Sequence, residues 1–137
     1  MAWPTGIGDE MRLKVQQYGF TLVELLVVMA LIALLLTIAT PRYFGSLEKS
    51  KETVLRQNLA LTRESLDKYY GDTGKYPDTL DMLVSKKYLR KLPIDPITES
   101  ATTWIIIAPD DIEKGGVFDI KSGAAGNGSD GTAFSEW

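Results

Sequence analysis

The chain has 137 residues, with 15 Lys and Arg against 18 Asp and Glu, so its formal net charge at pH 7 is −3. This length allows one modest domain plus an appendage, and the balanced charge predicts no nucleic-acid partner. The sequence contains neither cysteine nor histidine, which excludes disulfides, thiol redox chemistry, Ser/His/Asp and Cys/His catalysis, and zinc sites built on these residues.

The first predicted element is a membrane-spanning helix at residues 20–40, FTLVELLVVMALIALLLTIAT. Its 21 residues suffice to cross about 30 Å of hydrocarbon, whereas a secretory signal has a shorter apolar core followed by a small-residue cleavage site. Arg12 and Lys14 precede the run. The positive-inside rule therefore predicts a cytoplasmic N-terminus, with the C-terminal part across the membrane. Met11 is a second candidate for the true start, besides Met1.

One charged residue, Glu24, lies inside this apolar run. A carboxylate in hydrocarbon costs roughly 2.5–3.5 kcal/mol near the centre of a helix, and less near the end, where it reaches water. One interpretation is a plain single-span anchor that tolerates the glutamate and carries a binding module. The other is that Glu24 has a partner within the membrane.

The residues around Glu24 favour the second interpretation. The hexapeptide GFTLVE at residues 19–24, followed by an unbroken apolar helix and then Pro41, resembles the type IV prepilin family, which includes pilins and the pseudopilins of type II secretion. This resemblance implies that a membrane aspartyl peptidase removes a cytoplasmic leader, residues 1–19, by cutting between Gly19 and Phe20. It also implies that the same enzyme N-methylates Phe20.

The resemblance further divides the mature chain into a transmembrane and filament-core helix, residues 20–40, and a periplasmic domain, residues 41–137. In a filament, Glu24 of one subunit can meet the new Phe20 amine of a neighbour. Because a wrong register would leave the carboxylate unpaired, this ion pair is better understood as a register device for assembly than as a source of net stability.

Beyond Pro41 the helical pattern resumes. Apolar side chains recur at spacings near 3.6 residues, at Leu47, Val54, Leu55, Leu59, Leu66, Tyr69 and Tyr70. Glu52–Arg56 and Glu64–Lys68 are predicted i,i+4 ion pairs, and Gly71 is the predicted end. The pattern thus indicates one helix over about 20–70, kinked near Pro41, with a transmembrane half and an amphipathic half.

The remaining predicted elements are short. Asp78 is the predicted N-cap of a helix that ends near Lys86–Lys87, and two prolines make residues 92–96 an extended connector. Residues 104–108 and 117–120 are rich in β-branched and aromatic side chains and predict strands. The predicted fold is α+β and pilin-like, with the long N-terminal helix packed on a small antiparallel sheet.

The second half of the chain has its own resemblance. The segments KYPDTLDMLV, LPIDPIT and GVFDIKSG, together with Trp137, resemble the major, G-type pseudopilins of type II secretion. That resemblance implies a calcium ion in the C-terminal loop, bound by aspartates and backbone oxygens. The predicted ligands are Asp130, Asn127 and Ser129, with Ser122 and Glu136 as weaker candidates. The alternative is a metal-free surface loop closed by burial of Phe134 and Trp137.

The predicted function is a structural subunit, not an enzyme, of a periplasmic pseudopilus that drives protein export by type II secretion. The resemblance implies that its partners are further copies of itself, the prepilin peptidase and methyltransferase, minor pseudopilins, and an inner-membrane platform with a cytoplasmic ATPase. Before assembly, membrane lipid surrounds the helix, in a single pass of the bacterial inner membrane. The rival interpretations are a type IV pilus subunit for adhesion or motility and an anchored binding module.

Overall fold

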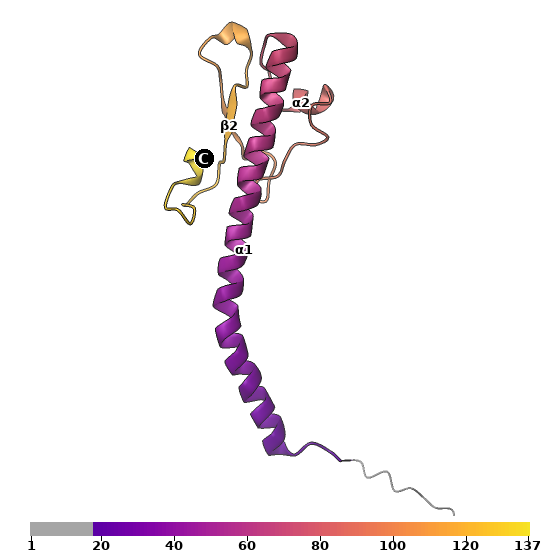
Figure 1. Ribbon diagram of the computed structural model, residues 1–137, viewed down its shortest axis with the longest axis vertical. Coiled ribbons are helices and arrows are strands. Elements are labelled where there is room, and N and C mark those ends of the chain that lie inside the picture. Colours follow the sequence, from indigo (N-terminus) through magenta and orange to yellow (C-terminus); the bar gives the residue numbers. More distant parts are fainter. Residues whose placement is uncertain (1–17) are drawn as a thin grey trace, which may run out of the picture. The chain divides into compact units, whose positions relative to one another are not determined.

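The structure is a computed structural model that describes residues 18–137. Expectations about residues 1–17, including most of the leader and the basic residues before the membrane, lie outside this part. The elements are α1 (Leu22–Thr73), α2 (Asp81–Ser85), β1 (Ile105–Ile107), η1 (Ile112–Lys114), β2 (Asp119–Lys121) and η2 (Phe134–Glu136) (Figure 1). The chain divides into two compact units, Met1–Ala39 and Thr40–Trp137, and each is described by itself.

In the first unit, residues 22–39 form the N-terminal part of α1. Its large apolar side chains are exposed, between 44% at Val28 and 75% at Leu22, and α1 is long and apolar enough to cross a membrane. Thr37 Oγ1 donates a hydrogen bond to the Ala33 carbonyl at 2.8 Å, so this hydroxyl is satisfied inside the helix. Such a surface suits hydrocarbon, which cannot supply hydrogen bonds to polar groups.

The helix continues through Pro41, as the sequence predicted. Proline lacks a backbone N–H, so the carbonyl of Thr37, four residues earlier, lacks its usual helical donor. The boundary between the two compact units falls at Ala39–Thr40, next to this position. The predicted kink near Pro41 stays a prediction.

In the second unit, α1 buries six side chains: Ser65 and a stripe of five, Leu55, Leu59, Thr62, Leu66 and Tyr69. The alternating spacing of four and three residues within the stripe keeps its five members on one helical face. The predicted stripe was wrong at Leu47 and Val54, which are 40% and 43% exposed. Val54 lies about 100° around the helix from Leu55, and Leu55 occupies the buried face.

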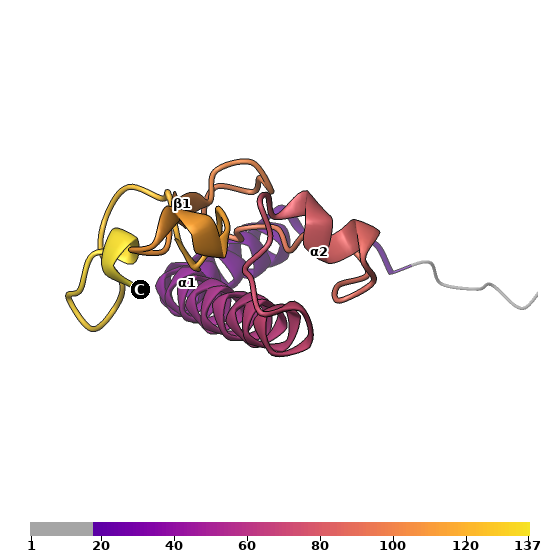
Figure 2. The same ribbon diagram turned by 90° about the horizontal axis from the view of Figure 1, so that it is seen from above.

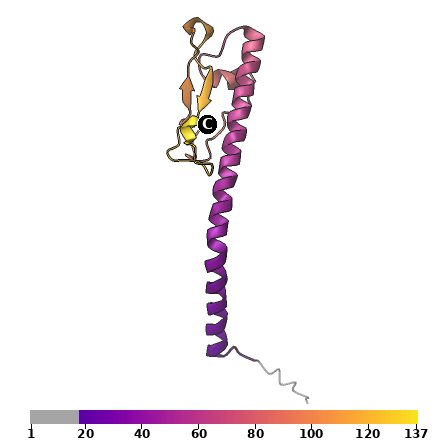
Figure 3. The same ribbon diagram turned by 60° about the vertical axis from the view of Figure 1, so that its left-hand side comes forward.

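The sheet consists of β1 and β2, which pair antiparallel with Ile106 opposite Ile120 (Figure 3). This confirms the predicted pair of strands, although each strand is shorter than expected. Trp104 and Val117, just before the two strands, are 7% and 1% exposed and belong to the core. The sheet and α2 flank the C-terminal part of α1 (Figures 1 and 2), which gives the α+β fold that the sequence predicted.

The predicted N-cap of α2 at Asp78 was wrong. The helix begins at Asp81, and its N-cap residue, Leu80, makes no side-chain cap hydrogen bond. Residues 76–77 instead make backbone hydrogen bonds to residues 114–117, with N···O distances of 2.6, 2.9 and 3.2 Å. This pairing occupies the backbone groups before Asp78, so the helix begins later. Its end at Ser85, with Lys86 as C-cap, agrees with the prediction.

The predicted end of the long helix at Gly71 was also wrong, because α1 continues to Thr73. Gly74 ends it, with a φ of +75° and a backbone N–H that donates to the Tyr70 carbonyl at 2.8 Å. A residue in this left-handed conformation commonly follows the last helical turn, and glycine adopts it without strain.

The two glycines should therefore respond to alanine in opposite directions. Gly71→Ala should raise the free energy of unfolding by about 0.5–1 kcal/mol, because alanine favours the helix interior and no atom lies within 4 Å of the added Cβ. Gly74→Ala should lower it, because its φ is +75°. Thermal unfolding of both full-length variants in detergent micelles measures the difference. If both substitutions changed the free energy of unfolding in the same direction, they would contradict the assignment of Gly74 as the residue that ends α1.

The connector at residues 92–96 is anchored by Asp95, whose side chain is fully buried. Asp95 Oδ2 accepts a hydrogen bond from Ser122 Oγ at 2.6 Å, and Oδ1 accepts from the Ile97 N–H at 2.8 Å. Asn58 of α1 also donates to the Ile94 carbonyl at 2.8 Å. Asp95 thus joins the connector to the segment that follows β2.

Candidate functional site

The predicted processing site lies immediately before α1. Residues 18–21 are not helical, Phe20 is 85% exposed, and no atom lies within 4 Å of a Cβ built on Gly19. A peptidase must bind the chain around the bond that it cuts, and an exposed, non-helical segment allows this. The geometry therefore suits cleavage between Gly19 and Phe20.

Thr21 fixes the start of α1. Its Oγ1 accepts a hydrogen bond from the Glu24 backbone N–H at 3.1 Å, and its carbonyl accepts from the Leu25 N–H at 3.1 Å. This is the N-cap arrangement, in which a side-chain oxygen satisfies an N–H that lacks a helical partner. The sequence analysis missed this role, although the spacing Thr-x-x-Glu is a known signal of a helix start.

Glu24 lies in the first turn of α1. Its carboxylate makes no ion pair with any other residue of the described range 18–137; the ion pairs there join Arg56 to Asp130, Arg63 to Asp119, and Lys68 to Glu64. A carboxylate on a lipid-facing helix is costly without a partner. A partner for Glu24 in the membrane would therefore have to come from outside this part of the chain.

The C-terminal loop places Asp130 against α1 and not at the centre of an oxygen cluster. Asp130 Oδ2 accepts from Arg56 Nη2 at 3.0 Å, while Oδ1 accepts from the Thr132 N–H at 2.9 Å and the Thr132 hydroxyl at 2.6 Å. Both carboxylate oxygens therefore already accept hydrogen bonds from the protein.

The other predicted calcium ligands are dispersed. Ser129 donates from its N–H and its hydroxyl to the Glu52 carboxylate, at 2.7 and 2.6 Å, and Ser122 donates to the buried Asp95. Asn127 and Glu136 are exposed. Within residues 18–137 no three acidic side chains gather in a way that could hold a metal ion. The side-chain oxygens of these predicted ligands are therefore not arranged in a way that fits a calcium ion.

Hydrogen bonds from Thr132 lower the pKa of the Asp130 carboxyl below its ordinary value of 3.8, with Arg56 acting in the same direction and desolvation opposing both. A carboxyl whose pKa is lowered in the folded state stabilises the fold above its ordinary pKa. That contribution is lost as pH falls through the lowered value. Asp130 is therefore charged at neutral pH, as its contact with Arg56 requires.

The polar face of α1 makes long-range contacts that the sequence analysis missed. Glu64–Lys68 forms the predicted i,i+4 pair at 3.1 Å, but the predicted Glu52–Arg56 pair was wrong, since these two side chains contact Ser129 and Asp130 instead. Residues separated by more than 70 positions meet here, so local spacing carried no signal for the contact.

Arg63 is a second such residue. Its Nε donates to Asp119 Oδ1 at 2.7 Å, and its Nη2 donates to the backbone oxygens of Ile120 and Trp137, both at 3.0 Å. A guanidinium group offers several donors in a fixed plane, so one side chain of α1 holds both β2 and the segment that ends at residue 137.

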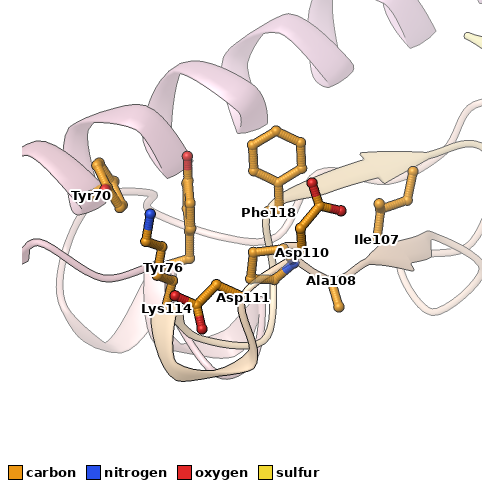
Figure 4. A pocket seen from close by; sticks show the side chains of 9 residues that line it. Tyr70, Tyr76, Ile107, Ala108, Asp110, Asp111, Lys114 and Phe118 are labelled. Carbon is orange, nitrogen blue, oxygen red and sulfur yellow. The ribbon is translucent and has the colours of Figure 1, made fainter.

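A pocket of about 360 Å³ lies between the end of α1, the sheet and the loop at residues 109–116 (Figure 4). Tyr70 and Tyr76 stack with ring centroids 4.5 Å apart, and Phe118 meets Tyr76 edge-on at 5.3 Å. Asp110 and Asp111 line the same pocket. It combines aromatic faces with carboxylates, and none of the site residues predicted from the sequence line it.

The sequence matches known proteins in two ways. A family model described as the prokaryotic N-terminal methylation motif matches residues 14–40, the range that contains Gly19, Phe20 and Glu24. The type II secretion system core protein G of Pseudomonas aeruginosa is 33% identical over 97 residues, which cover 59% of this chain and 68% of that protein.

Further relatives carry the same name. The core protein G of Aeromonas hydrophila is 31% identical over 99 residues, covering 61% of this chain and 69% of the relative. That of Escherichia coli K12 is 28% identical over 138 residues and covers 89% and 90% of the two chains. No solved structure matches. Together with the apolar α1 and the small sheet, these matches show that the chain belongs to the type II secretion system core protein G family and is a structural pseudopilin.

Proposed function

We propose that this pseudopilin is made as a membrane precursor, cut between Gly19 and Phe20, methylated at Phe20 and assembled into a periplasmic filament. The observation that carries the proposal is the arrangement at the start of α1. An exposed, non-helical Gly19–Phe20 bond directly precedes a capped helix whose apolar side chains are exposed. The matched methylation motif spans the same residues.

Assembly accounts for two unusual features of α1, which are its exposed apolar side chains and the carboxylate of Glu24. Packing of many such helices covers the exposed apolar side chains from Leu22 to Ile38, which a single subunit leaves to lipid. The same packing brings the Phe20 amine of one subunit to Glu24 of another, which pairs the carboxylate. The proposed role is that of a structural subunit and not of an enzyme, in keeping with the type II secretion core protein G relatives.

The proposed partners follow from this route. They are further copies of the chain, a prepilin peptidase and methyltransferase, minor pseudopilins, and an inner-membrane platform with a cytoplasmic ATPase. The proposed orientation places the N-terminus in the cytoplasm and the folded unit, Thr40–Trp137, in the periplasm. The type II secretion relatives favour a short pseudopilus over a long adhesive or motile pilus.

Mass spectrometry of the protein extracted from membranes tests the proposal directly. The expected mass is that of residues 20–137 plus one methyl group, with the methyl group on the N-terminal peptide that begins at Phe20. An intact mass that retains the residues before Phe20 would contradict processing. It would also favour the single-span anchor.

Replacing the residue before the cut tests which bond is cleaved. Gly19→Val should leave the full-length precursor in the inner membrane, because a branched side chain next to the bond would block a peptidase site shaped for glycine. Immunoblotting of membrane fractions separates the two forms by size. Gly45→Val is a matched control, since no atom lies within 4 Å of either added Cβ. Normal processing of Gly19→Val would refute the assigned bond.

A further inference from the structure

The C-terminal loop closes onto α1 through four side chains that contact one another in a ring. The Arg56 guanidinium lies 3.8 Å from the centroid of the Trp137 ring and donates to Asp130 at 3.0 Å. Asp130 accepts the Thr132 hydroxyl at 2.6 Å, and Thr132 Oγ1 accepts the Trp137 indole N–H at 2.6 Å. Each side chain thus contacts the next, and we refer to these four residues as the Arg56 network.

The loop is shaped to fit α1 around this network. Glu52 lies one helical turn before Arg56 and accepts both donors of Ser129. Ser129 and Asp130, which are consecutive in the loop, therefore contact consecutive turns of α1. Ser129 binds the acid Glu52, and Asp130 binds the base Arg56. Gly128 leaves room for the indole, because a Cβ at this position would collide with the Trp137 ring. Trp137 is only 9% exposed as a result.

A calcium ion does not fit this arrangement. Calcium binds six to eight oxygens, usually with several carboxylates among them. Here Asp130 already uses both carboxylate oxygens, and the Ser129 hydroxyl donates to Glu52. The Arg56 guanidinium lies 3.0 Å from Asp130 Oδ2, so a dication at this carboxylate would be repelled by a cation already in contact with it.

We propose that Arg56 supplies the positive charge that holds the C-terminal loop, so that the folded subunit does not need calcium. The guanidinium does this in two ways, as an ion-pair partner of Asp130 and as a cation stacked on the face of Trp137. Because Arg56 is part of α1, its local concentration at the loop is fixed by the chain. Closure of the loop is then independent of the calcium concentration around the protein.

The test is thermal unfolding of the full-length protein in detergent micelles, followed by near-ultraviolet circular dichroism. Each variant is measured in millimolar calcium chloride and in excess EGTA. The wild-type midpoint should be the same in both conditions. Arg56→Ala should lower it by about 4–8 °C in both, and Arg56→Lys by less, because lysine keeps the charge but lacks the planar group that stacks.

Lys68→Ala is the matched control. It removes an exposed ion pair of similar length, 3.1 Å, from the same helix, but this pair does not reach the loop. Its midpoint should change by less than that of Arg56→Ala. A wild-type midpoint that rises in calcium and falls in EGTA would overturn the proposal. An Arg56→Ala shift no larger than that of Lys68→Ala would overturn it as well. If Arg56→Ala does not fold, the proposal is tested by the midpoint of Arg56→Lys and by the wild-type midpoints in calcium and in EGTA.

Discussion

Glu24→Ala is expected to abolish filament assembly while leaving membrane insertion, leader cleavage and the folded unit unchanged. Insertion should be easier, because the change removes a charge from the span. The start of α1 should persist, because Thr21 caps it by accepting from the backbone N–H of residue 24, which alanine also has. Assembly should fail because the Phe20 amine of a neighbouring subunit would enter the hydrocarbon with no carboxylate to pair with.

The measurement is the yield of sheared filaments or of crosslinked subunits at matched membrane levels. Glu24→Gln should fail less completely, because an amide oxygen can accept one hydrogen bond without neutralising the amine. Val23→Ala, a neighbouring change with no charge, controls for altered packing and should assemble. Wild-type yield from Glu24→Ala would show that the membrane tolerates this carboxylate and that assembly does not use it.

Asp95→Ala should destabilise the folded unit by about 3 kcal/mol, the largest effect expected outside the membrane helix. The side chain is fully buried, and its loss leaves the Ser122 hydroxyl and the Ile97 N–H without their acceptor. Each buried polar group left unsatisfied costs about 1–3 kcal/mol. The expected result is a marked fall in the thermal midpoint of the full-length protein.

Two variants make this prediction specific. Asp95→Asn keeps the size of the side chain and one acceptor oxygen, so its midpoint should lie between those of wild type and Asp95→Ala. Asp110→Ala removes an exposed aspartate from another loop and should leave the midpoint almost unchanged. If Asp95→Ala and Asp110→Ala had equal midpoints, Asp95 would not anchor the connector.

The sequence predicted those parts of the fold that depend on local pattern. A continuous apolar run gave the first part of α1, and the β-branched segments gave both strands, because helix and strand periodicity are read over a few residues. Glu24 was recognised as unusual for the same reason, since one charge interrupts an otherwise uniform run. Gly19 and Phe20 came from the resemblance of their motif and not from any pattern of polarity.

The contacts that close the domain could not be predicted in this way. Arg56 and Arg63 resemble ordinary exposed cations of an amphipathic helix, and only the return of the chain over α1 shows what they bind. Asp95 resembles a turn residue between prolines, and its burial depends on Ser122, which is 27 positions away. The misplaced cap at Asp78 has the same origin, because a distant segment pairs with the residues before it.

The cap at Thr21 has a consequence for the timing of assembly. The hydrogen bonds that define the start of α1, from the N–H groups of residues 24 and 25, all lie on the C-terminal side of the Gly19–Phe20 bond. Removal of the leader, as proposed, would take away none of them, so we expect the helix to begin at the same residue before and after the cut. The proposed processing would add a positive amine at Phe20, two residues before the first helical residue, Leu22. In the proposed route, the start of α1 is therefore already formed in the precursor, and cleavage removes the leader and exposes the amine that assembly uses.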